Sequence, residues 1–102
     1  MIGYQGKVKQ SSTVVSVGTD PVKILDDDDN RICAWVSQSP FSTGPVAICH
    51  SFADAANAGI PSEYQVYPYY IYDHFAAWAI IDRRSGFTGP YEIVVVTVHK
   101  AE

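Results

Sequence analysis

The sequence predicts an all-β protein, an antiparallel β-sandwich or jelly-roll-like barrel of about seven or eight strands. Three observations point to this class. Apolar residues occur in short runs rich in valine, isoleucine, tyrosine and tryptophan, which fit a pleated sheet. Turns rich in glycine, proline, aspartate and serine separate these runs. The length of 102 residues fits one domain, so we expect a single β-sandwich over residues 1–102.

The amino-terminal half contains four expected strands. Residues 1–12 are mixed and polar, and we consider them a candidate N-terminal arm that packs on a neighbouring molecule or stays unpacked. Residues 13–17 are rich in valine and end at a glycine, and residues 21–25 alternate before an acidic run. Residues 31–37 are rich in β-forming residues, and residues 46–50 follow after a loop that contains proline and glycine.

The carboxyl-terminal half contains one helical turn and three further strands. Residues 51–58 are rich in alanine and hold the only expected helical turn, which a Gly-Ile-Pro sequence ends. Residues 64–72 hold five tyrosines, and Pro68 within them cannot donate to a β-ladder, so we expect an edge or bulged strand there. Residues 76–81 form a compact apolar run, and residues 91–99 carry four valines and an isoleucine.

Composition and charge argue against several classes of function. Seven lysines and arginines stand against eleven acidic residues, which gives a net charge of −4 at pH 7. A general nucleic-acid binder needs clustered basic side chains, and so does a protein that docks on an anionic membrane. The longest apolar run, residues 93–98, is far shorter than the roughly 20 residues that cross a bilayer. We therefore expect a protein made in the cytoplasm, without an export signal, that binds neither nucleic acid nor membrane.

Four adjacent aspartates and an asparagine at residues 26–30 form a candidate metal site. Asp26, Asp28 and Asn30 are spaced like the first ligands of a calcium loop. However, Arg31 stands where such a loop needs glycine for its sharp turn, and Ser37 stands where it needs a bidentate glutamate. We therefore expect a solvated, sharply turning loop without a cofactor, and calcium binding is the alternative.

The sequence lacks a constellation of residues typical of an enzyme. Asp73 and His74 are adjacent, but His50 and His99 lie far from them in the sequence. No serine or cysteine stands in a recognisable nucleophile motif, and no two histidines have metal-ligand spacing. We therefore expect a protein that is not an enzyme.

The two cysteines, Cys33 and Cys49, lie in consecutive expected strands. If these strands pair in the register that places Trp35 opposite Ala47, the two thiols face each other and a disulfide becomes geometrically allowed. A reducing cytosol disfavours that bond, so we expect two small buried thiols.

Aromatic residues exceed what a core of this size needs. Tyrosine joins an apolar ring to a polar hydroxyl, so surplus tyrosines are typical of subunit interfaces and of sugar-binding surfaces. We expect Tyr67, Tyr69, Tyr70 and Tyr72 to lie at an interface. A large aromatic core with tyrosines at its rim and a carbohydrate platform are the alternatives.

A series of short motifs runs through the chain in a fixed order. They are residues 16–25 (SVGTDPVKIL), 30–36 (NRICAWV), 44–49 (GPVAIC), 59–61 (GIP), 72–80 (YDHFAAWAI) and 93–98 (IVVVTV). In this order they resemble the small β-sandwich structural proteins of tailed-phage virions, which decorate capsids or form head and tail fittings. The chain departs from that family around Pro68, where the family has a glycine-rich loop.

The resemblance implies a non-enzymatic virion structural protein, a capsid decoration or stabilising protein or a head or tail fitting, that acts through protein–protein contacts. Its partners would be the major capsid protein or other virion proteins, together with further copies of itself in a trimer or another cyclic ring. It would be located in the virion after synthesis in the host cytoplasm. A carbohydrate-binding module for adhesion to a host surface is the alternative function.

Overall fold

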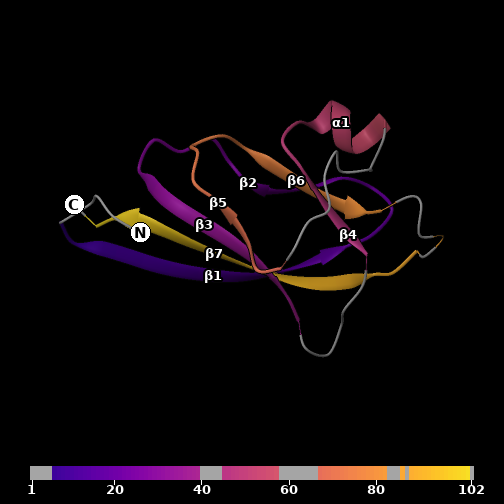
Figure 1. The fold of residues 1–102 in the computed structure, drawn as a ribbon, viewed down its shortest axis with the longest axis horizontal. Coiled ribbons are helices and arrows are strands. Elements are labelled where there is room, and N and C mark those ends of the chain that lie inside the picture. The colour runs from indigo at the N-terminus through magenta and orange to yellow at the C-terminus, as the bar shows by residue number, and fades with distance from the viewer. Residues whose placement is uncertain (1–5, 40–44, 58–66, 83–85, 87, 102) are drawn as a thin grey trace.

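The computed structural model describes residues 6–39, 45–57, 67–82, 86 and 88–101. These residues form an antiparallel β-sandwich with seven strands and one short helix, which confirms the predicted fold class (Figure 1). In chain order the elements are β1 (Val8–Val17), β2 (Val22–Leu25), β3 (Arg31–Gln38), β4 (Val46–Cys49), α1 (Phe52–Asn57), β5 (Tyr69–Ile71), β6 (Ala77–Ile81) and β7 (Tyr91–Lys100).

The strands form two sheets that enclose one apolar core. The four-stranded sheet has the order β1-β7-β3-β5 and the three-stranded sheet the order β2-β6-β4. Alternate side chains of both sheets point into the space between them, as the two-residue period of a strand requires. The buried members of this core are Val17, Leu25, Ala34, Val36, Val46, Ile48, Ile71, Ala77, Ala79, Ile81, Ile93 and Val95.

Helix α1 covers the other face of the three-stranded sheet, above β4 and β6 in Figure 1. Ala55 is fully buried in a second cluster with Ala47, Cys49 and Ile80. The Ser51 Oγ accepts a hydrogen bond of 3.1 Å from the Asp54 N–H, which caps the helix at its amino end. The helical turn expected at residues 51–58 is thus confirmed. Among the described residues, no helix is long and apolar enough to cross a membrane.

The two edge strands of the four-stranded sheet, β1 and β5, differ in length from the sequence-based expectation. β1 begins at Val8, so residues 8–12 belong to a strand and not to an N-terminal arm; residues 1–5 lie outside the described residues. These polar residues pair with β7 through backbone groups, which need no apolar side chains. β5 comprises only three residues, directly after Pro68, and lies at the edge of its sheet as expected.

The register that would bring the two cysteines face to face does not occur, because β3 and β4 lie in different sheets. β3 pairs with β5 and β7 in one sheet, whereas β4 pairs with β6 in the other. Consecutive strands of a sandwich often lie in different sheets, as β3 and β4 do. Cys33 and Cys49 are free, buried thiols, which confirms the expectation of two small buried thiols.

Candidate functional site

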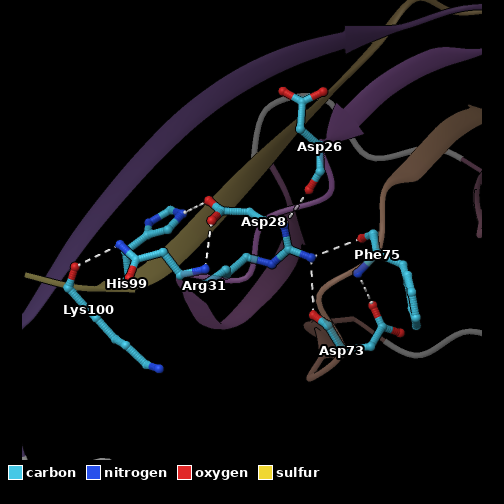
Figure 2. Close-up of polar contacts among 8 residues, drawn as sticks. Asp26, Asp28, Arg31, Asp73, Phe75, His99 and Lys100 are labelled. Carbon is cyan, nitrogen blue, oxygen red and sulfur yellow. Dashed lines mark hydrogen bonds and ion pairs between the residues drawn. The ribbon is translucent and has the colours of Figure 1, made fainter.

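A polar network closes one end of the sandwich, where the loop after β2 meets the loop after β5 (Figure 2). Its centre is Arg31, the first residue of β3, whose side chain is only 1% exposed. One guanidinium nitrogen, Nη1, donates to the Asp26 carbonyl at 2.9 Å. The other, Nη2, donates to the carbonyls of Asp73 at 3.1 Å and Phe75 at 2.9 Å. We call Arg31 and these three carbonyl oxygens the Arg31 clamp.

Asp28 connects the same end of the sandwich to β7. Its Oδ1 accepts from the Asn30 N–H at 2.8 Å, and its Oδ2 lies 2.8 Å from the His99 Nε2 (Figure 2). The Asn30 N–H holds the pKa of the Asp28 carboxyl below its usual value, and the His99 ring adds to this effect against a partial desolvation that raises the pKa. The Asn30 side chain donates to the Lys100 carbonyl at 3.1 Å. Asp28 and Asn30 thus tie a loop to the end of a strand.

The three candidate calcium ligands, Asp26, Asp28 and Asn30, all have partners within the chain. The Asp26 carboxylate is exposed and lies 3.2 Å from the Lys23 Nζ, while its carbonyl belongs to the Arg31 clamp. The neighbouring Asp27 accepts from the Ala76 N–H at 2.8 Å. In the described part of the chain, no three histidine, cysteine or acidic side chains gather as a metal site would require. The contacts of Asp26, Asp27 and Asp28 are with backbone and side-chain groups of the chain itself.

The structure divides the four tyrosines that we expected at an interface. Tyr67 and Tyr69 pack against the core, and the Tyr67 hydroxyl donates to the Val46 carbonyl at 2.7 Å. Burial raises the pKa of Tyr67. Tyr70 and Tyr72 point the other way and are 51% and 64% exposed. The strand period separates them, because successive side chains of β5 face opposite sides of the sheet.

Tyr70 and Tyr72 belong to the outer sheet face, which we define as the face of the four-stranded sheet that points away from the core. Their rings are stacked at 6.2 Å with an interplanar angle of 9°. The Trp35 ring lies 6.1 Å from the Tyr70 ring. The described aromatic side chains of this face therefore form a continuous row.

Pairing between the strands defines the rest of the outer sheet face. One row crosses the sheet through Ser12, Val96, Trp35 and Tyr70. A neighbouring row contains Val14, which is 61% exposed, together with Val94 and Ser37. A third contains Gln10, Val98 and Cys33. Among the described residues, charge enters this face only at its ends, at Glu92 and Lys100.

His50 and His99 each contact another side chain, and Cys49 is a buried thiol. The His50 Nε2 lies 3.3 Å from the Tyr69 hydroxyl, and His99 contacts Asp28. Cys49 adjoins His50 in the sequence, but burial raises the pKa of its thiol and the Asp54 carboxylate raises it further. A thiol of raised pKa is a poor nucleophile, because the thiolate is the reactive form.

Sequence reasoning missed the Arg31 clamp. A signal was present, since Arg31 opens a strand whose next five residues are apolar, and buried arginines need several acceptors. Its three acceptors are main-chain carbonyls, and these leave no trace in the sequence.

Comparisons with protein-family models, with curated proteins and with solved structures found no significant match to this chain.

Proposed function

We propose that this chain is a non-enzymatic structural protein of a phage virion, attached through its outer sheet face to the major capsid protein or another virion protein. The observation that carries the proposal is the lack of charge on that face between Glu92 and Lys100 in the described strands. Depletion of charge and enrichment in tyrosine and tryptophan are typical of the centre of a protein interface. The resemblance of its motif order to that of small virion proteins supports the proposed location in the virion.

The chemistry of the outer sheet face suits a protein partner. Val14, Tyr70 and Tyr72 are each more than half exposed. Removing such apolar surface from water contributes about 25 cal/mol per Å² before the costs of association are subtracted. Tyrosine and tryptophan are also the side chains most often found as hot spots of binding energy. We therefore expect the row of Trp35, Tyr70 and Tyr72 to dominate the contact.

Reconstitution of virus particles tests this proposal. Particles assembled without the chain are mixed with purified protein, and the bound fraction is measured by co-sedimentation and mass spectrometry. We expect the wild type to bind at a copy number set by particle symmetry and the Tyr72→Ser variant to bind at least about tenfold more weakly. Phe75→Ser is the matched control, because Phe75 is an equally exposed aromatic residue, at 67%, in the loop beyond β5. Absence of binding by the wild type, or equal loss in both variants, would refute the proposed function.

Carbohydrate binding is the second candidate, and the stacked pair of Tyr70 and Tyr72 favours it specifically. Exposed aromatic rings that lie parallel offer a flat apolar surface on which the C–H face of a sugar can stack. A glycan array distinguishes the two functions. Selective sugar binding that Tyr70→Ser abolishes would support adhesion to a host surface, whereas an array without selective signal would leave the virion role.

A further inference from the structure

β1 is an edge strand that buries very little. It is the first strand of its sheet, and no described segment pairs with its outer edge (Figure 1). Residues 8–14 are exposed on both faces, and only Val17 at the end of the strand is buried. All ten residues of β1 nevertheless keep a regular antiparallel register with β7. A long strand that is ordered but uncovered offers its free edge as a template for another strand.

The hydrogen bonds at the start of β1 determine which backbone groups face that free edge. The Ala101 N–H donates to the Lys7 carbonyl at 2.9 Å, so the backbone groups of Lys7 point toward β7. Pairs in an antiparallel ladder alternate between hydrogen-bonded and non-hydrogen-bonded, so the residues of even number point the other way. The Lys100 N–H agrees with this pattern, because it turns away from β1 and donates to the Asn30 carbonyl. The free edge therefore presents the N–H and C=O groups of Val8, Gln10, Ser12, Val14 and Ser16.

The other sheet edges carry features that hinder pairing, and β1 lacks them. β5 has three residues and follows Pro68, and β2 has four residues with an irregular register between Lys23 and Leu25. β4 has four residues, and its Val46 carbonyl already accepts from the Tyr67 hydroxyl. β1 contains ten residues without a proline or a register shift. Short length, proline and bulges are the usual protections of an edge, so β1 is the edge open to a partner.

We propose that β1 pairs antiparallel with β1 of a second copy of this chain, with Ser12 on the two-fold axis. Hydrogen bonding requires residues of even number to face each other. The register centred on Ser12 uses all five of them, since Val8 then faces Ser16 of the second copy and Gln10 faces Val14. Each of these five pairs exchanges two hydrogen bonds, so the edge gains about ten.

The charge pattern of β1 agrees with this register. Lys9 is the one charged residue of the strand, and it faces Val15 of the second copy. No two like charges of β1 lie opposite each other, whereas facing lysines would oppose pairing. The two copies form one eight-stranded sheet, and their outer sheet faces join into a single surface. This inference goes beyond the proposed function, because it holds whatever that surface binds.

Opposite charges placed on the axis test the pairing and its register together. Ser12 is exposed, so Ser12→Lys and Ser12→Glu leave the fold intact. In sedimentation velocity over a micromolar concentration series we expect the wild type to dimerise, and each variant alone to dimerise about tenfold more weakly, because like charges meet at the axis. An equimolar mixture of the two variants restores the dimer. Ser16→Lys is the matched control, because its side chain faces Val8 of the second copy and not another lysine.

Ser12→Pro provides a second test. It removes an N–H that faces the free edge and leaves the bonds to β7, so it weakens the dimer without unfolding the sheet. A wild type that stays monomeric throughout would overturn the proposal. A dimer that is indifferent to Ser12→Lys, or that Ser16→Lys weakens equally, would also overturn it. If instead the outer sheet face does not bind virus particles, the result is different. Tyr72→Ser then leaves particle binding unchanged, and the wild type still forms the dimer.

Discussion

Replacing Arg31 with methionine removes the centre of the Arg31 clamp and fills a similar volume. Three carbonyl oxygens, those of Asp26, Asp73 and Phe75, then lose their donor. A net contribution of about 1 kcal/mol for each hydrogen bond gives a loss of about 3 kcal/mol. A charged donor raises this figure, whereas relief from burying a guanidinium lowers it. The Arg31 Nε finds no acceptor among the described residues, which adds to the cost of burying the guanidinium. A loss of this size is a large part of the roughly 5–15 kcal/mol that typically stabilises a domain.

Urea denaturation followed by tryptophan fluorescence measures this loss. We expect Arg31→Met to lower the free energy of unfolding by about 3 kcal/mol and Arg31→Lys to recover a part of it, since one ammonium cannot reproduce the planar fork. Lys23→Met is the control, because it removes a positive charge beside the same Asp26 at the exposed surface and costs at most about 1 kcal/mol. An Arg31→Met variant as stable as the wild type would show that the clamp does not hold the loops together.

Three further predictions concern acid stability, a turn and the thiols. The pKa of Asp28 is lower in the folded chain than its ordinary value of 3.8, so the ionised carboxylate stabilises the fold at pH values above 3.8. This stability is lost as the pH falls through the folded pKa. We therefore expect Asp28→Asn to lower stability at neutral pH and to flatten the acid limb of a stability–pH curve. We expect Gly89→Ala to lower the free energy of unfolding in urea by about 3 kcal/mol, because φ is +69° and the new Cβ would lie 2.5 Å from a methyl group of Ile81. Gly86→Ala is the control, because φ is +76° but the space around it is open, and we expect a loss of about 1 kcal/mol. Cys33 and Cys49 are buried, and the pKa of Cys49 is raised. We therefore expect an aromatic disulfide reagent to label both thiols slowly in the native protein and rapidly in urea. Equal labelling rates in the two conditions would contradict their burial.

The pattern of side chains was sufficient to predict the fold class. The features that it did not predict, the start of β1 and the pairing of β3 and β4, depend on backbone hydrogen bonds. The valines of residues 91–99 and the apolar run at residues 76–81 predict β7 and β6 within one residue at each end. Residues 8–12 contain few apolar side chains, so nothing in their composition distinguishes a strand held by backbone bonds from an arm. Whether Cys33 faces Cys49 depended on which strands pair. β3 and β4 are consecutive in the sequence but pair with different strands, β7 and β6.

The candidate sites show the same division. A count of aromatic residues identified the tyrosine segment, but only the observed strand phase separates the exposed Tyr70 and Tyr72 from the inward-facing Tyr67 and Tyr69. Arg31 was expected to begin a strand and to disfavour a calcium loop, but its side chain also connects three segments. Its acceptors come from main-chain atoms 5 to 44 residues away, which side-chain patterns do not encode.

Hydroxyl-radical footprinting of the protein, free and bound to virus particles, tests the role of the outer sheet face most directly. Oxidation of Tyr70 and Tyr72 reports on that face, and oxidation of Phe52 reports on α1, which covers the opposite sheet. All three are more than half exposed in the free chain, so each is open to the radical. We predict that binding to particles protects the two tyrosines and leaves Phe52 unchanged. Unchanged oxidation of the tyrosines in the bound protein, or protection of Phe52 instead, would contradict attachment through the outer sheet face.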